Sequence, residues 1–172
     1  MQKVLVKTGN SKINPKPANL QDDALQQALR FLGYRSRSEA EIRAHLSRRS
    51  YPPAAVNRAL TRLRSLNYVG DENFAKNWAL SRVQSRGFGP LRIEHELKGK
   101  GIGDALRRAV VDDLFGAGQE TERAKLVLQK RFKGKSFQDP KSLRQAAAFL
   151  ERQGFSGEAI AELLGLVNRP ND

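Results

Sequence analysis

The stretch that decides the fold is residues 86–102, which reads RGFGPLRIEHELKGKGI. Gly89 and Pro90 form its entry, because glycine gives the backbone freedom at a turn and proline presets φ for the first turn of a helix. The spacing predicts a helix that begins at about Pro90, with Ile93 and Leu97 one turn apart on its apolar face. The glycines after Leu97 are expected to end it. We therefore expect a short helix with a buried apolar face and basic residues at both ends.

The apolar pattern of this helix and its neighbour recurs along the chain. Leu46, Leu97 and Leu150 stand at nearly constant spacing, and each is preceded by an apolar residue four positions earlier. A pattern that recurs every ~50 residues is the mark of a repeat architecture. The full set comprises Ile42, Leu46, Val56 and Leu60, then Ile93, Leu97, Leu106 and Val110, then Ala146, Leu150, Ile160 and Leu164.

Helix signals divide the chain into three modules of three helices each. We expect a basic arm over 1–20, repeat 1 over 21–69, repeat 2 over 70–115, repeat 3 over 116–167 and a tail over 168–172. A module of this size buries little surface alone, so neighbouring modules are expected to stack. The predicted fold is all-α, with three tandem helix-turn-helix-like modules in an elongated, curved array.

Three helix starts carry recognisable capping residues. Ser38 and Glu41 have the spacing of a capping box, in which each side chain bonds the backbone N–H of the other residue. Asp71 is predicted to cap the first helix of repeat 2. Asp139 and Pro140 form a cap followed by a proline in the first turn, which predicts the start of another helix.

Composition limits the classes of function. The 172 residues carry a formal net charge of +13, while 39% of them are hydrophobic and 7% are aromatic. A strongly positive protein attracts polyanions. No apolar run approaches the ~18–20 residues that cross a bilayer, and there is no cysteine for a disulfide or a zinc finger. We therefore expect a cytoplasmic protein that binds nucleic acid, or something coated on it, without membrane contact.

Catalytic motifs are missing from the sequence. His95-Glu96 lacks the second histidine of a zinc-protease helix, and no glycine-rich phosphate loop is present. His45 does not occupy the repeat position of His95, so the two histidines do not form a repeated site. We expect no enzyme activity, no metal and no cofactor.

The basic residues are the best candidates for a binding site. A stacked array of modules would align them as a charged track that follows a phosphate backbone or an acidic protein helix. The alternative is that they are solvated helix faces, supported by pairs such as Arg92–Glu96. The candidates are Arg35, Arg37, Arg43, Arg48, Arg82, Arg86, Arg92, Lys98, Lys100, Lys130, Arg131 and Lys133.

Sequence-specific reading of DNA by helix-turn-helix modules is a competing interpretation. The third helix of repeat 1 carries Arg58 and Arg62, whereas the third helix of repeat 3 carries Glu158 and Glu162. A row of three recognition helices is therefore not supported. Most aromatic residues fall on apolar stripes, so stacking platforms for single strands are also few.

Four segments resemble the RecX family and follow in the family's order. They are RSRSEAEI at 35–42, DENFA at 71–75, GFGPLRIEHELKGKGI at 87–102 and FLERQGF at 149–155. The third segment is the most specific. Gly70 departs from the acidic residue that the family often has before its aspartate, and the N-terminal arm has no matching counterpart.

The resemblance implies a regulator of the RecA recombinase that is not itself an enzyme. Family members bind RecA and its filament on single-stranded DNA, lie in the filament groove and restrain filament growth, ATP hydrolysis and strand exchange. We expect a monomer in which Arg86, Arg92 and Lys100 make polar contacts with the filament or directly with DNA. The alternative function is a sequence-independent DNA-binding protein that acts by competition for single strands.

Overall fold

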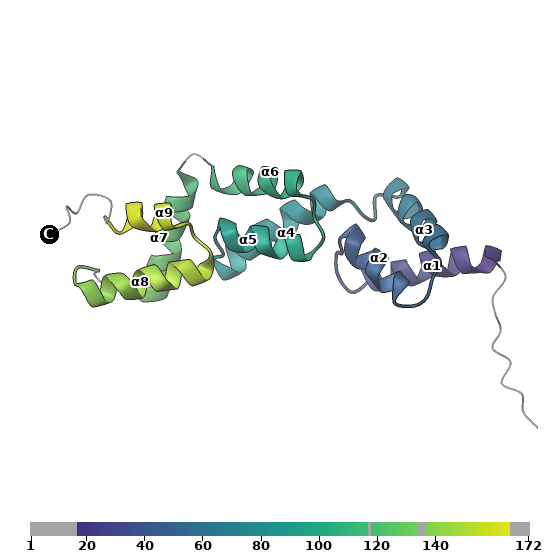
Figure 1. The fold of residues 1–172 in the computed structure, drawn as a ribbon, viewed down its shortest axis with the longest axis horizontal. Helices are drawn as coiled ribbons and strands as arrows, with labels where there is room; N and C mark the ends of the chain where they lie inside the picture. The colour runs from purple at the N-terminus through teal and green to yellow at the C-terminus, as the bar shows by residue number, and fades with distance from the viewer. Residues whose placement is uncertain (1–16, 117, 134–136, 166–172) are drawn as a thin grey trace, which may run out of the picture.

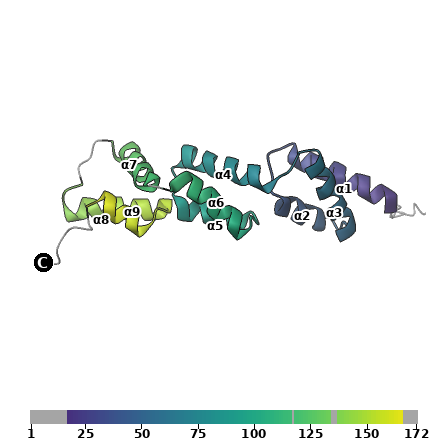
Figure 2. The same ribbon diagram turned by 90° about the horizontal axis from the view of Figure 1, so that it is seen from above.

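The computed structural model describes residues 17–116, 118–133 and 137–165, and within these ranges every regular element is an α-helix. The helices follow one another along an elongated molecule (Figures 1 and 2), in the order α1–α3, α4–α6 and α7–α9. The all-α class and the three-helix modules are thus confirmed. The helices are α1 Pro17–Leu32, α2 Glu39–Ser47, α3 Pro53–Ser65, α4 Asp71–Arg86, α5 Pro90–Gly99, α6 Asp104–Phe115, α7 Gln119–Phe132, α8 Pro140–Gln153 and α9 Gly157–Leu163.

The repeated apolar pattern marks the core. Its members are buried except Leu106 and Leu164, which are half-buried and pack against the core. Helix α1 begins at Pro17, inside the segment predicted as a basic arm, while residues 1–16 and 166–172 lie outside the described residues. The predicted pattern therefore identified the buried residues, and the start of α1 is earlier than the sequence suggested.

Repeat 1 has a hydrophobic core of its own. Helices α1, α2 and α3 all pack against one another. Ile42, Leu46 and Leu60 are fully buried between them, together with Leu63. Repeat 1 therefore buries its apolar faces internally rather than against its neighbour.

Repeats 2 and 3 instead share one continuous core. Ile93 and Leu97 of α5 belong to the same buried cluster as Leu128 of α7 and Leu150 of α8. Phe115, at the end of α6, is also part of it. The expected stacking through apolar surface is therefore found between repeats 2 and 3. The junction between repeats 1 and 2 is instead largely polar.

The predicted caps are confirmed at two helices and wrong at a third. Ser38 and Glu41 form the capping box of α2, and the Asp139 carboxylate accepts two backbone N–H bonds at the start of α8. Asp71 is not the N-cap of α4, because Gly70 takes that position. Asp71 Oδ1 instead accepts a hydrogen bond from the Glu39 backbone N–H at 2.9 Å. As the first residue of α4, Asp71 lies beside the start of α2 and bonds a free N–H there.

The N-terminal end of α5 is the joint with repeat 3. The Gly89 N–H donates to Gln153 O at 2.8 Å, and the Leu91 N–H donates to Gly154 O at 3.0 Å. Free N–H groups at the start of one helix thus meet free carbonyls at the end of α8, which satisfies both. Gly89 is the N-cap of α5 and Pro90 its first residue, so the predicted entry of this helix is confirmed.

The C-terminal end of α5 is the joint with repeat 1. Ser38 Oγ donates to Lys100 O at 2.6 Å, and Lys100 Nζ lies 3.0 Å from Glu41 Oε1. Gly101 has φ +76° and lies against Ala40, so a Cβ there would overlap the alanine side chain. Residues 86–102 therefore connect all three repeats.

Candidate basic interface

The first group of predicted site residues meets at the junction of repeats 1 and 2. Arg37 and Arg48 of repeat 1 line one hollow together with Lys98 and Lys100 of repeat 2. The Arg37 guanidinium lies 4.0 Å from the centroid of the Phe31 ring, which also lines this hollow. Residues that are far apart in the sequence thus form one basic hollow.

Glu41 organises the charges at this junction. Its carboxylate accepts hydrogen bonds from Arg35 Nη2 at 2.7 Å, from Lys100 Nζ at 3.0 Å and from the Ser38 backbone N–H at 3.2 Å. Burial by itself raises the pKa of Glu41, but these hydrogen bonds outweigh it and lower the pKa to about 2. The ionised carboxylate therefore holds Arg35 and Lys100 in fixed positions.

Trp78 of α4 continues this charged surface into repeat 2. The Arg82 guanidinium carbon lies 4.1 Å from the ring centroid, Lys100 Nζ 4.5 Å and the Arg35 guanidinium carbon 5.8 Å. The indole Nε1–H donates to Glu96 Oε2 at 2.9 Å, and Arg82 Nε donates to the same oxygen at 3.0 Å. Cations at these distances are attracted to the ring face, so Trp78 links the junction to Arg82.

The second hollow lies at the α4–α5 turn. Arg82, Arg86 and Arg92 line it with Phe88, Glu96 and Gln153. The Arg92 guanidinium stacks 3.9 Å from the Phe88 ring centroid and donates to Arg152 O at 2.9 Å. The expected Arg92–Glu96 support is therefore wrong, because Glu96 bonds Arg82 and Trp78 while Arg92 bonds repeat 3.

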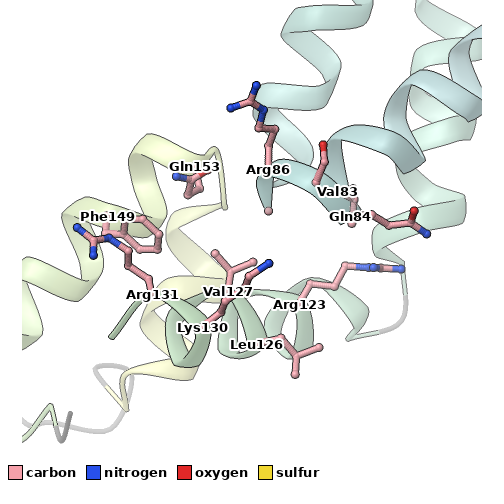
Figure 3. Close-up of a pocket in the computed structure, with 12 residues that line it drawn as sticks. Val83, Gln84, Arg86, Arg123, Leu126, Val127, Lys130, Arg131, Phe149 and Gln153 are labelled. Atoms are coloured by element: carbon pink, nitrogen blue, oxygen red, sulfur yellow. The ribbon is translucent and has the colours of Figure 1, made fainter. Parts of the chain in front are cut away.

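The third hollow is the α4–α7 cleft, which lies between the end of α4 and the first helix of repeat 3 (Figure 3). Arg86, Lys130 and Arg131 line it. Arg123 lines it as well, although the sequence did not single out this residue. The sequence did hold a signal for Arg123. At helical spacing it falls on the same helix face as Val127, Lys130 and Arg131, two of which were predicted site residues.

Three predicted residues lie outside these hollows. Arg43 is exposed and donates to Asn57 Oδ1 at 2.7 Å within repeat 1. Lys133 is the exposed C-cap of α7 and lines none of the three hollows. Arg35 contributes through Glu41 and Trp78 rather than as a lining residue.

The remaining candidates form a continuous surface. The hollows connect because Lys100 and Arg82 both lie near Trp78, and because Arg86 lines both the second and the third. We call this surface the basic track. It consists of Arg37, Arg48, Lys98, Lys100, Arg82, Arg86, Arg92, Lys130 and Arg131.

Two family models match the first two modules. The first three-helix domain of RecX matches residues 24–63, and the second three-helix domain of RecX matches residues 71–111. The regulatory protein RecX of Syntrophotalea carbinolica is 36% identical over 141 residues, which are 80% of this chain and 92% of that protein. The chain belongs to the RecX family. The regulatory protein RecX of Mycolicibacterium smegmatis is 31% identical over 144 residues, which are 81% of this chain and 77% of the relative.

Solved structures of RecX proteins have the same fold. The crystal structure of RecX from Lactobacillus salivarius superposes with a TM-score of 0.73 at 20% identity, covering 88% of this chain and 98% of the other. A second crystal structure of a regulatory protein RecX gives a TM-score of 0.69 at 24% identity, covering 86% of this chain and 74% of the other. The nine helices of the described residues are therefore the RecX architecture of three-helix repeats.

As a member of the RecX family, this chain is a regulatory protein and not an enzyme. In the described part of the chain, no set of three His, Asp or Glu side chains is arranged to hold a metal ion, and none of the helices there is both long and apolar enough to cross a bilayer. His45 is buried and stacks on Phe31 with ring centroids 3.8 Å apart, and burial and nearby arginines lower its pKa. His45 is therefore a packed core residue.

Proposed function

We propose that this chain binds the RecA recombinase and its filament on single-stranded DNA, and restrains filament growth, ATP hydrolysis and strand exchange. Membership in the RecX family supports the class of partner. The observation that carries the proposal is the basic track, which runs through contacts in all three repeats. An elongated molecule with cations along its length suits a helical polymer that carries nucleic acid.

The charges of the track are held in place by the joints of the fold. Glu41 fixes Lys100, Glu96 fixes Arg82, and Arg92 bonds a carbonyl of repeat 3. Preorganised cations lose less side-chain entropy on binding than free ones. We propose that Arg86 and Arg92 contact the filament directly, because both are exposed at the centre of the track.

The test is ATP hydrolysis by RecA that depends on single-stranded DNA, measured while this protein is added at fixed excess DNA. We expect inhibition at amounts well below those that cover the DNA, and no relief when free DNA is added. Inhibition that needs coverage and is relieved by more DNA would instead identify competition for DNA. No inhibition at any ratio would overturn the proposal.

A pair of double variants assigns the effect to the track. We expect Arg86→Ala with Arg92→Ala to raise the concentration for half-maximal inhibition about tenfold, which is the loss of ~1.4 kcal/mol from two charged contacts. The matched control is Arg58→Ala with Arg62→Ala, which removes the same charge from exposed positions of α3 outside the track. Equal effects of the two double variants would contradict the assignment. Helix content is expected to be unchanged in both.

Competition for single strands remains the second candidate function, because the net charge of +13 favours any polyanion. Binding of single-stranded DNA by about six phosphate contacts predicts a log–log salt slope near −4, since each contact contributes ~−0.7. The two functions are separated by the stoichiometry of inhibition described above.

A further inference from the structure

We propose that the α4–α7 cleft is a docking site for an acidic, amphipathic peptide segment of a protein partner. This is a protein contact, distinct from the phosphate contacts expected of the rest of the basic track. The cleft has a volume of about 590 Å³ and lies between repeats 2 and 3. The residues that line the cleft form an apolar floor and a cationic rim.

The floor of the cleft is aliphatic. Val83 of α4 and Val127 of α7 face each other across it, and Leu126 lies at its edge (Figure 3). Leu126 is 62% exposed, so its side chain is free to contact an apolar side chain of a partner. An apolar cleft with an exposed leucine at its edge offers burial to apolar side chains of a partner.

The rim is uniformly cationic. Arg86 comes from α4, and Arg123, Lys130 and Arg131 come from α7. The lining residues in the described part of the chain include no carboxylate, and the ion pairs found there involve none of these four cations. Charge complementarity therefore selects a partner that brings its own glutamates or aspartates around an apolar anchor.

A peptide fits this cleft better than nucleic acid does. Bases bind single-strand grooves by stacking on aromatic rings. The lining contains one aromatic residue, Phe149, whose ring is packed edge-to-face against Phe132 with centroids 5.5 Å apart. An amphipathic helix places its apolar face in a groove and its charges along the rim, which matches the arrangement here.

The walls of the cleft are fixed in the free protein. Gly87 ends α4 with φ +65°, and a Cβ on it would come within 2.8 Å of Val127 Cγ2, so the chain at the end of α4 lies close against Val127 of α7. Arg123 Nε donates to Leu114 O at 2.9 Å, which ties α7 to the end of α6. A preformed site binds a peptide at a lower ordering cost than a flexible one.

The experiment measures fluorescence anisotropy of a fluorescein-labelled peptide in which leucines recur at helical spacing among glutamates. The comparison peptide has the same composition with its leucines dispersed around the helix. We expect the first peptide to bind more tightly, with an affinity that falls as salt rises. Leu126→Glu and Lys130→Glu are each expected to weaken its binding about tenfold. The control variant is Leu91→Glu, because Leu91 is 56% exposed on α5 and does not line the cleft.

Four results would overturn the proposal. Equal binding of the dispersed and the patterned peptide would reduce the interaction to net charge. Equal binding of the patterned peptide to Leu126→Glu and to the control variant, with circular dichroism showing both folded, would remove the role given to Leu126. Binding of oligo(dT) that both cleft variants weaken to the same extent would make the cleft a nucleic-acid groove. A dimer of the protein alone, seen by sedimentation and disrupted by Leu126→Glu, would assign the cleft to a second copy of this chain.

Discussion

Gly89 has no room for a side chain, because a Cβ would come within 2.5 Å of Gly154 O and 2.6 Å of the Phe155 nitrogen. Both neighbours are backbone atoms that cannot rotate away. We expect Gly89→Ala to separate α5 from α8 and to lower the free energy of unfolding by about 2 kcal/mol. Urea unfolding followed by circular dichroism measures this change.

The control for this prediction is Gly99→Ala at the other end of α5. Nothing lies within 4 Å of a Cβ at Gly99, which is the last residue of the helix. Alanine there is expected to leave stability unchanged or raise it by up to about 1 kcal/mol, because it reduces the freedom of the unfolded chain. Equal destabilisation by the two substitutions would show that glycine flexibility, rather than the close contact at Gly89, is what matters.

The low pKa of the Glu41 carboxyl makes the free energy of unfolding depend on pH. Its pKa is about 2 in the folded protein and about 4.3 in an unfolded chain, so the folded state favours the ionised form. Its contribution is therefore complete above about pH 5 and is lost as the pH falls toward 2. Because Glu41 is partly exposed, solvent screening reduces this contribution to about 1 kcal/mol.

The measurement compares unfolding of the wild type and Glu41→Gln between about pH 7 and pH 2. The difference in unfolding free energy is expected to shrink as the pH falls. Glu72→Gln is the control, because Glu72 forms only an exposed pair with Lys76 at 2.9 Å. A difference for Glu41→Gln that stays constant with pH would contradict the role given to its carboxylate.

Local chemistry was readable from the sequence, and contacts between distant residues were not. The capping box of Ser38 and Glu41 depends on residues three apart, so it was predicted correctly. Asp71 was assigned to its own helix, whereas its partner is the N–H of Glu39 in another repeat. Spacing within a helix likewise suggested an ion pair between Arg92 and Glu96. In the fold, Glu96 instead accepts hydrogen bonds from Trp78 and Arg82.

At the scale of elements, α5 was predicted closely, yet its role as a joint was not. Pro90 and the following glycines mark its start and end by their backbone preferences. That its two ends bond different repeats depends on where α2 and α8 lie, which no local pattern encodes. The basic track shows the same limit, because the sequence predicted that its cations align as a track, while their division into three hollows came from the fold.

Ser38 has two roles at the junction of elements, and a substitution can separate them. Its hydroxyl accepts from the Glu41 N–H to cap α2 and donates to Lys100 O of repeat 2. We expect Ser38→Ala to cost about 2 kcal/mol, since it removes a cap and leaves the part-buried Lys100 carbonyl without its partner. Ser156 caps α9 through Ala159 N alone, so Ser156→Ala is expected to cost about 1 kcal/mol.

Thermal and urea unfolding of these two serine variants provide the comparison. A cost for Ser38→Ala no larger than that for Ser156→Ala would show that the bond to Lys100 contributes nothing to stability. A double variant of Ser38→Ala with Glu41→Gln is expected to show non-additive costs, because the two side chains share one capping box and one neighbour.

At the scale of the whole molecule, the two hydrophobic cores divide the chain unevenly. Repeat 1 has its own core, while repeats 2 and 3 share another. The junction between the cores is made by Ser38, Glu41, Asp71 and Lys100, which are polar or charged. A polar junction buries little apolar surface, so it couples the folding of its two sides weakly. The repeat pattern in the sequence predicted three tandem three-helix modules and did not reveal that two of them share a core.

Hydrogen exchange in two core variants tests this division. Leu60 is fully buried in repeat 1 and Leu97 in repeat 2, so replacing either by alanine is expected to cost about 3 kcal/mol locally. Leu60→Ala should reduce amide protection in α1–α3 and leave α4–α9 unchanged, because the two cores do not touch. Leu97→Ala should reduce protection in α4–α6 and α7–α9 together. Loss of protection along the whole chain in both variants would mean that the polar junction couples all three repeats into one folding unit. Loss confined to α4–α6 in Leu97→Ala would mean that the shared core does not unite repeats 2 and 3.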